Sequence, residues 1–327
     1  MSKPWADHPE LVEFFTRHRS RAEELYRSER RFLPWLAAQA VSICDVGCAV
    51  GGFSEIWRAY RPDIAYTGVD LSPTMISAAK TRYPNCAFLC GNAVEGIALP
   101  DRSAVVVQAL GWLHWEPAYA QALEELWRLT SRYLFFDVRL VAASDHARTG
   151  QQKIALTSSW DGASTTPYLT VAWPPLASLL LQLKPARLLG YGYWGKPADT
   201  VTGIDGPVCF ATFVMEKPVV EQLPYTPQVC VDLPWPWPDE FRRGVSVAPA
   251  SQLERFVPLV HSSASAETPD HGREGMRRSC VDEMSPMQAA AAKSEPRLRR
   301  DASPKSAQVS GGRRRATRDP GLAREAR

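Results

Sequence analysis

Short apolar runs alternate regularly with amphipathic helical patterns between residues 41 and 140, and this alternation constrains the fold more than any other feature. Five apolar runs of strand length lie at 41–46, 64–70, 86–90, 103–110 and 132–140. Helical patterns fill three of the gaps, at 52–60, 73–82 and 117–129. Strands that are apolar on both faces and alternate with helices are typical of a parallel sheet covered by helices on both sides.

The pattern changes after residue 140. A possible strand near 152–156 precedes a helix at 174–183, and two strand-like runs follow at 186–194 and 208–217. A turn-rich segment joins these two runs, which predicts an antiparallel pair at the edge of the parallel sheet. The fold class that we predict is therefore α/β, with a doubly wound, mostly parallel seven-stranded sheet that ends in a C-terminal antiparallel hairpin.

Composition divides the chain of 327 residues into three parts. Residues 1–40 are helical in pattern and are expected to form a lid, 41–220 form the α/β domain, and 221–327 form a Pro-rich extension with a basic tail. Residues 261–327 hold 14 Lys and Arg against 9 Asp and Glu, whereas the rest of the chain is close to neutral. Because little apolar surface remains beyond about residue 245, we expect disorder from there onward.

Several classes of function are disfavoured by the same composition. The seven cysteines are odd in number and lie mostly in apolar runs, which favours reduced thiols rather than a metal site. No apolar run approaches the roughly 20 residues of a membrane span, and the N-terminus has no apolar signal core. We therefore expect a cytoplasmic protein that binds neither a metal nor a membrane, and for which nucleic acid is a disfavoured partner.

The first strand runs into an acidic residue and then a glycine-rich turn, "CDVGCAVGG". In an open parallel sheet, ligands bind outside the carboxyl ends of the strands. Asp45 stands two residues before Gly47, and the G-x-G-x-x-G spacing of a dehydrogenase is absent because Ala49 takes the second glycine position. An anionic pyrophosphate is disfavoured beside Asp45, whereas a ligand that carries an ammonium and a sulfonium is favoured.

The second and third strands end in residues suited to a nucleoside. Asp70 lies 23 residues beyond Gly47, where a carboxylate can accept both hydroxyls of a ribose, in a nucleotide or a nucleoside alike. Asn92 is placed to bond the edge of a purine, although an Asn in a turn without any ligand is an alternative. These residues indicate an adenosine ligand.

With these motifs in view, the chain resembles the class I S-adenosylmethionine-dependent methyltransferases (the type 11/25-like domains). The resemblance rests on "DVGCAVGG", "GVDLSPTMISAAK", "GNA" and "VVVQALGWLHW", and covers residues 41 to about 140, extending to about 217 by the order of elements. Ala49 and Asn92 depart from the family's usual Gly and Asp. The resemblance implies S-adenosyl-L-methionine as cofactor, bound by Asp45, Gly47, Cys48, Gly51, Asp70, Leu71, Met75, Asn92, Ala93 and Leu110.

Other residues are candidates for the methyl acceptor. His114, in "LGWLHWEP", is the candidate general base, although a packing role is the alternative. Arg139 lies at the end of the fifth strand and is a candidate for holding a carboxylate or phosphate of the substrate, or for pairing with Asp137. Tyr26, Glu29 and Arg30 are possible contacts from the lid.

We therefore predict an S-adenosylmethionine-dependent methyltransferase with a small-molecule O or N acceptor. An RNA or protein methyltransferase that uses the basic tail is an alternative within the same fold. An NAD-dependent oxidoreductase and a non-catalytic cofactor-binding protein are alternatives from other classes. The sequence names neither the acceptor nor the oligomeric state.

Overall fold

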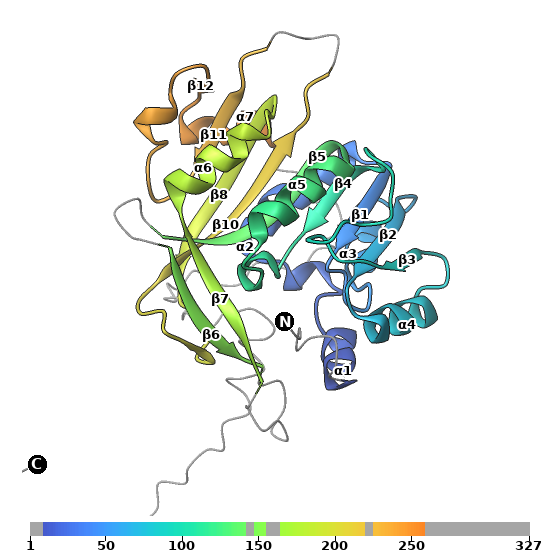
Figure 1. The fold of residues 1–327 in the computed structure, drawn as a ribbon. Coiled ribbons are helices and arrows are strands. Elements are labelled where there is room, and N and C mark those ends of the chain that lie inside the picture. Colours follow the sequence, from blue (N-terminus) through green and yellow to red (C-terminus); the bar gives the residue numbers. More distant parts are fainter. Residues whose placement is uncertain (1–8, 142–146, 155–163, 220–224, 259–327) are drawn as a thin grey trace, which may run out of the picture. The chain divides into compact units, whose positions relative to one another are not determined.

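The computed structural model of the protein describes residues 9–141, 147–154, 164–219 and 225–258, and is built around one large twisted sheet (Figure 1). The main path of the sheet runs in the order β12-β11-β8-β10-β5-β4-β1-β2-β3. A side branch adds three strands, because β7 pairs with β5 and β6, and β6 pairs with β9. The strands are β1 (Ser42–Val46), β2 (Ala65–Asp70), β3 (Ala87–Cys90), β4 (Ala104–Ala109), β5 (Thr130–Val141), β6 (Arg148–Lys153), β7 (Thr165–Ala172), β8 (Arg187–Gly195), β9 (Val201–Thr202), β10 (Val208–Glu216), β11 (Gln228–Asp232) and β12 (Ser246–Val247).

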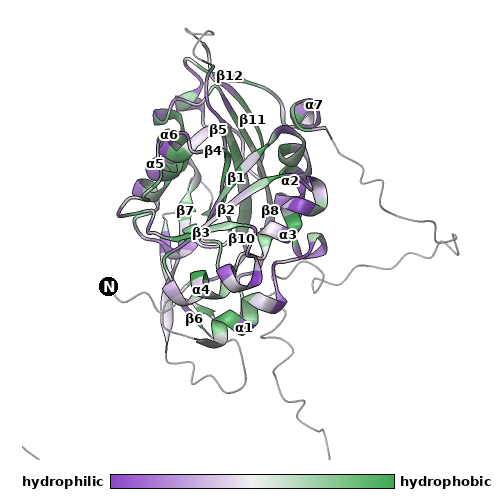
Figure 2. Ribbon diagram, turned by 90° about the vertical axis from the view of Figure 1, so that its right-hand side faces the viewer, coloured by the Kyte–Doolittle hydropathy of each residue, from purple (hydrophilic) through white to green (hydrophobic). Residues whose placement is uncertain are grey.

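Helices cover both faces of the sheet. Figure 2 shows α5 and α6 on one side and α2, α3 and α7 on the other. The α-helices of the described residues are α1 (Pro9–Arg17), α2 (Arg27–Gln39), α3 (Phe53–Tyr60), α4 (Pro73–Arg82), α5 (Tyr119–Leu129), α6 (Trp173–Gln182) and α7 (Leu253–Phe256). None of these helices is both long and apolar enough to cross a membrane.

The sequence of the central strands supplies apolar side chains to both faces. In β5, Leu134 and Phe136 belong to the core under α5 and α6, whereas Tyr133 and Phe135 belong to the core under α2 and α3. All four are at most 1% exposed. Successive side chains of a strand point to opposite faces. The apolar run at 133–136 of β5 is therefore buried on both faces only because helices cover both sides of the sheet.

The predicted α/β class and mostly parallel sheet are confirmed. The strands β1, β2, β3, β4 and β5 pair in parallel, and β10 pairs antiparallel with both β5 and β8. The count of seven strands was wrong, since the described residues alone form a sheet of twelve. The antiparallel pair is also not at the edge, because β11 pairs with β8 and β12 pairs with β11.

The extension after the hairpin is part of the core, which corrects the expectation of disorder from about residue 245. Trp237 is 3% exposed and packs edge-on against Trp173 of α6, 5.6 Å between ring centroids. Leu253 and Val257 are at most 3% exposed and join the core on the side of α2. A few well-placed apolar residues in a Pro-rich segment suffice to anchor it, although they give no periodic pattern. The tail from residue 259 lies outside the described residues.

The fold places a ligand site at the carboxyl ends of the central strands. β1 is paired with β2 on one side and with β4 on the other, so the connections that follow β1 and β4 leave in opposite directions along the sheet. This reversal of strand order opens the crevice in which ligands of such sheets bind. The chain segments that close over this crevice are α1 and the arm formed by β6 and β7 (Figure 1).

Replacement of Leu253 by alanine tests the place of the extension in the core. We expect the free energy of unfolding to fall by about 2–4 kcal/mol, because a buried leucine is truncated. Arg255→Ala, two residues away on the exposed side, is the control and should change it by less than about 0.5 kcal/mol. Chemical denaturation of the full chain measures both, and equal effects would contradict this packing.

Candidate functional site

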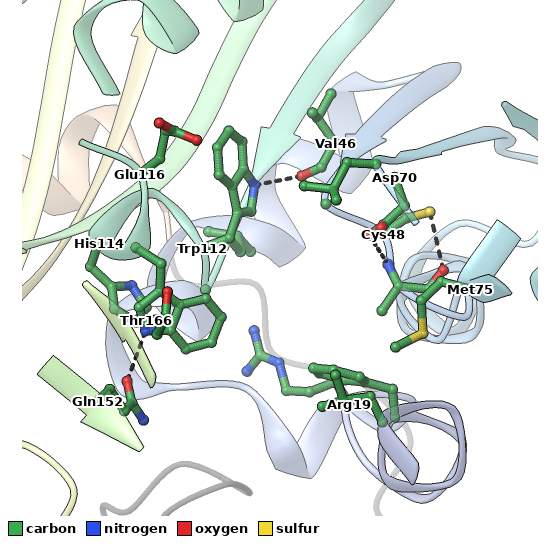
Figure 3. A pocket seen from close by; sticks show the side chains of 18 of the residues that line it. Arg19, Val46, Cys48, Asp70, Met75, Trp112, His114, Glu116, Gln152 and Thr166 are labelled. Atoms are coloured by element: carbon green, nitrogen blue, oxygen red, sulfur yellow. Dashed lines mark hydrogen bonds between the residues drawn. The ribbon is translucent and has the colours of Figure 1, made fainter. Parts of the chain in front are cut away.

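The strand ends, α1 and the β6–β7 arm together line a cavity of about 630 Å³. This volume falls within the range of roughly 300–1,000 Å³ that is usual for small-molecule sites. Figure 3 shows Cys48, Asp70 and Met75 on one side of it and His114, Gln152 and Thr166 on the other, with Trp112 and Arg19 between them. We call the first side the strand-end half and the second the arm half.

The glycine-rich turn, residues 47–52, forms the wall between β1 and α3. The backbone N–H groups of Gly47 and Cys48 both donate to the carbonyl of Val69 in β2, at 2.7 and 3.0 Å. Ala49 has φ of +47°, in the left-handed region that favours glycine. This explains why a glycine is usual at that position. The backbone N–H of Ala49 donates to the carboxylate of Asp70 at 2.9 Å.

Neighbouring side-chain and backbone atoms make two of the turn's glycines necessary. A Cβ on Gly47 would lie 2.4 Å from Cδ1 of Trp112, whose indole N–H donates to the carbonyl of Val46 at 2.7 Å. A Cβ on Gly52 would lie 2.6 Å from the carbonyl oxygen of Arg19. The turn is thus in close contact with the segment after β4 and with the N-terminal segment.

Asp70, at the end of β2, is half-buried beside the turn and lines the cavity. Its carboxylate accepts one N–H from Ala49 and one from Ser72, each at 2.9 Å. Burial raises the pKa of Asp70, and the backbone N–H groups oppose that rise. Each oxygen keeps lone pairs for a further donor such as a ribose hydroxyl. The cap of α4 is Ser72, whose hydroxyl accepts the N–H of Met75, so Asp70 is not needed for that purpose.

Six other residues predicted to hold the cofactor also line the cavity. They are Gly47, Cys48, Leu71, Met75, Ala93 and Leu110. Asn92 lines it too, but its side-chain oxygen accepts the N–H of Val94 at 3.0 Å, which leaves the amide NH₂ for a ligand. The predicted residues of β1, β2, β3 and β4 are therefore brought together on one surface.

Asp45 and Gly51 lie outside the lining of the cavity. Both oxygens of Asp45 are engaged, by the hydroxyl of Tyr66 at 2.5 Å and by the amide of Gln108 at 2.8 Å, and the residue is 2% exposed. This geometry does not support a direct contact with a ligand. Gly51 has φ of +80° and packs against the ring of Phe88, so its role is in the turn itself.

His114, in the short 3₁₀ helix Leu113–Trp115, lines the arm half of the cavity and is 6% exposed. Its ring packs against Trp115 and Tyr168, at 4.5 and 5.2 Å between centroids. Burial, and then the charge of Arg139, lower its pKa well below the ordinary value. The imidazole is therefore neutral at pH 7, and its affinity for a proton is lower than that of an exposed imidazole. Among the described residues no hydrogen bond is recorded to its Nδ1.

Arg139, near the end of β5, lines the same half and is 4% exposed. Its Nη1 donates to Asp137 at 2.6 Å, and its guanidinium lies 4.2 Å from the ring centroid of Phe210. Asp137 also accepts the N–H of Gly111 at 2.5 Å. The alternative in which Arg139 pairs with Asp137 is thus observed, yet the guanidinium still faces the cavity, and its Nε has no partner among the described residues.

The arm supplies residues that the sequence analysis did not single out. Gln152 of β6 accepts the indole N–H of Trp115 at 2.8 Å, and Thr166 and Tyr168 of β7 line the cavity. The strand β7 was predicted as loop, because Pro167 and a run of threonines interrupt its apolar pattern. The β-branched residues Thr165, Thr166, Thr170 and Val171 were the local signal available for a strand.

The N-terminal segment supplies another unpredicted residue, Arg19. It lines the cavity together with Leu11 and Phe14 of α1, and with Tyr26, which was predicted. Glu29 does not reach the cavity but binds Arg19, and Arg30 binds the backbone carbonyls of Glu23 and Leu25. Of the expected lid, α1 covers the cavity, whereas α2 packs against β8 and β10.

Comparison with known proteins agrees with this arrangement. Residues 44–133, which run from β1 to β5 and include the turn, Asp70, Asn92 and His114, match the family model described as a methyltransferase domain. They form a methyltransferase domain of the class I family. S-Adenosyl-L-methionine is the methyl donor of this family.

The curated relatives match only part of this chain. A trans-aconitate 2-methyltransferase of Methylobacterium radiotolerans is 33% identical over 85 residues, 26% of this chain and 32% of that protein. A malonyl-[acyl-carrier protein] O-methyltransferase of Serratia marcescens is 32% identical over 88 residues, 27% of this chain and 33% of that protein. The chain therefore spans about a third of the length of these curated relatives. A solved magnesium protoporphyrin IX methyltransferase of Synechocystis PCC 6803 is 15% identical over 56% of this chain and 75% of its own, with a TM-score of 0.35.

The buried position of Asp45 predicts a pH dependence of stability. Burial raises the pKa of Asp45 from 3.8 to about 6, so its folded form binds a proton more tightly than its unfolded form. The contribution of the Asp45 carboxyl group to the free energy of unfolding is fully present below about pH 4 and is lost as the pH rises through 6. The unfolding free energy of the wild type, relative to Asp45→Asn, should fall by roughly 3 kcal/mol between pH 3.5 and 7. Denaturant titrations across this range measure it, and a constant difference would contradict the assignment.

Proposed function

We propose that the protein transfers a methyl group from S-adenosyl-L-methionine to a small-molecule O or N acceptor. The observation that carries this proposal is the continuity of the cavity. One end is lined by the strand-end residues of a methyltransferase domain, and the other by groups suited to hold an acceptor. Both ends open into the same volume of about 630 Å³.

The residues of the strand-end half fit the cofactor. Asp70 has free lone pairs for ribose hydroxyls, and Asn92 has a free amide NH₂ for the purine edge. Leu71, Met75 and Ala93 supply apolar contacts for the adenine, and the backbone around Gly47 and Leu110 borders the methionine portion. When bound, the cofactor supplies an activated methyl group on a sulfonium whose leaving group is neutral.

The chain's own contribution to the reaction is alignment and the exclusion of water. Methyl transfer to a nucleophile is a displacement, so it gains most from holding the acceptor in line and close. Trp115, Tyr168 and Phe210 form an apolar wall in the arm half, and Arg139 is held rigidly between Asp137 and Phe210. A planar acceptor with a carboxylate or a polar oxygen fits these groups, with the anionic group toward Arg139.

Neutral His114 can accept a proton from an acceptor that must lose one. A hydroxyl or an ammonium acceptor needs such a base, whereas a carboxylate does not. The relatives are named for trans-aconitate and for malonyl-[acyl-carrier protein], and a small acid as acceptor is in keeping with the first of these. The acceptor-binding role of Arg139 is common to either kind of substrate.

Replacement of Asp70 tests the cofactor site. We expect the full-length wild type to bind S-adenosylhomocysteine and to show no comparable affinity for NAD. Asp70→Ala should weaken S-adenosylhomocysteine binding by about 10–100-fold, because two or more charge-assisted hydrogen bonds are lost. Asp63→Ala, at an exposed carboxylate, is the control and should bind as the wild type does. Calorimetry measures all three, and preferential NAD binding would favour the oxidoreductase instead.

The role of His114 is tested with acceptors of two kinds. For hydroxyl or amine acceptors, His114→Gln should lower kcat by about 10²–10⁴-fold, because proton removal is lost. For carboxylate acceptors kcat should change little, and in both cases the affinity for S-adenosylhomocysteine should be kept. The release of S-adenosylhomocysteine with a panel of small acids, phenols and amines measures this. Near-normal turnover of every hydroxyl and amine substrate by His114→Gln would show that His114 packs in the cavity wall and is not the base.

The alternative of an RNA or protein substrate is tested by truncation after residue 258, which retains all of the described core. The small-molecule proposal predicts full activity without the basic tail. Loss of activity with intact S-adenosylhomocysteine binding would favour the macromolecular substrate.

A further inference from the structure

We propose that Arg19 binds the carboxylate of the cofactor's methionine portion and so ties the N-terminal segment to the bound cofactor. This inference rests on the proposed function. It assigns a binding role to a residue in a polar segment, "RHRSR", that carries no motif.

Arg19 is held in place by a pair of contacts to a fully buried acid. Its Nη1 and Nη2 donate to the two oxygens of Glu29 at 2.9 and 2.7 Å. Glu29 is 0% exposed and also accepts the backbone N–H of Tyr26 at 2.8 Å. A bidentate arginine–carboxylate pair of this kind fixes the guanidinium in one orientation. The long side chain is therefore already ordered before a ligand binds, which lowers the entropic cost of binding.

The guanidinium keeps one edge for a second carboxylate. Glu29 occupies the end formed by Nη1 and Nη2, and Nη1 also donates to the carbonyl of Glu24 at 3.2 Å. Within the described part of the chain, no hydrogen bond is recorded for Nε. Because arginine has five N–H donors in a planar fork, the edge formed by Nε and Nη2 remains able to bind two oxygens side by side.

The position of Arg19 matches the amino-acid end of the cofactor rather than its adenosine end. The guanidinium lies 4.7 Å from the ring centroid of Phe53, the first residue of α3, and the Arg19 carbonyl abuts Gly52. Asp70, the candidate ribose ligand, lies at the other side of the turn (Figure 3). A cofactor whose ribose is at Asp70 and whose methionine follows the turn therefore directs its carboxylate toward Arg19.

The charges around the turn agree with this direction. Asp45, the acid predicted to interact with the cofactor, has both oxygens occupied and does not line the cavity. Arg19 lies beside the start of α3, and its side chain is 13% exposed. Since a neighbouring cation favours an anion, the carboxylate of an amino-acid group is the fitting partner at this place.

Arg139 also lines the cavity and could bind an anion, but we assign it to the acceptor. Its guanidinium packs on Phe210 of β10 and pairs with Asp137 of β5, so it is anchored to the sheet beyond β4. Arg19 is instead anchored to the turn after β1 and to α2. The ring of Tyr26 lies near both, with its centroid 5.0 Å from the guanidinium of Arg19 and 5.9 Å from that of Arg139.

The test compares two ligands that differ only in the carboxylate. Calorimetry of the full-length protein measures S-adenosylhomocysteine and its decarboxylated analogue, S-adenosyl-3-thiopropylamine. The wild type should prefer S-adenosylhomocysteine by about 10–100-fold, as expected for a bidentate charged contact. In Arg19→Gln this preference should fall to within about threefold, because only the first ligand loses a partner. Arg21→Gln, at an exposed arginine two residues away, is the matched control and should keep the preference.

Other outcomes overturn the proposal in distinguishable ways. If Arg19→Gln weakens both ligands equally, Arg19 supports the lid and does not bind the carboxylate. If it leaves both unchanged and raises only the KM of the acceptor, Arg19 belongs to the acceptor site. Arg19→Lys is measured in the same way, because it keeps the charge beside Glu29 and loses the fork; an undiminished preference would also overturn the proposal. A wild type that binds neither ligand overturns the proposed function itself.

Discussion

The hydrogen bond from the backbone N–H of Ala49 to the carboxylate of Asp70 is the contact on which the site depends. It joins the turn after β1 to the end of β2, and it holds Ala49 in a left-handed conformation that a residue with a Cβ seldom adopts. Strain of this kind, on the order of 1–2 kcal/mol, persists only where the surroundings enforce it. Asp70 thereby shapes the turn with one set of lone pairs and faces the cavity with another.

The remainder of the cavity is brought to this turn by segments that lie outside the central strands. The salt bridge between Arg19 and Glu29 holds the N-terminal segment in place. The hydrogen bond from the indole N–H of Trp115 to Gln152 ties the β6–β7 arm to the segment after β4. In proteins built on such a sheet, loops and additions around the fixed scaffold set the specificity of the site. We infer that the strand ends determine the cofactor and that the arm determines the acceptor.

Much of the fold and of the strand-end half could be predicted from the sequence. The apolar runs of β1, β4 and β5 are mostly buried, so their pattern is continuous. The ends of β1, β2 and β3 are marked by Asp45, Asp70 and Asn92. Position at a strand end did not reveal which acid faces the ligand. Asp70 lines the cavity, whereas both oxygens of Asp45 accept hydrogen bonds from Tyr66 and Gln108. This difference depends on side chains that are distant in sequence.

The parts that could not be predicted are those anchored by single contacts. The strand β7 contains a proline, and the extension that ends in α7 is held by isolated residues such as Trp237 and Leu253, so neither has a periodic pattern. Arg19 is a further case, because its partner Glu29 is ten residues away and both belong to a charged stretch typical of a solvated helix. Burial alone distinguishes them from surface charges.

The central claim is that one cavity holds the cofactor along the turn between Asp70 and the N-terminal segment. A crystal structure of the full-length protein with S-adenosylhomocysteine tests it most directly. The account predicts electron density for the ribose within hydrogen-bonding distance of Asp70, and for the homocysteine carboxylate at the guanidinium of Arg19. Density that places the ribose away from Asp70, or that runs outside this cavity, would contradict it.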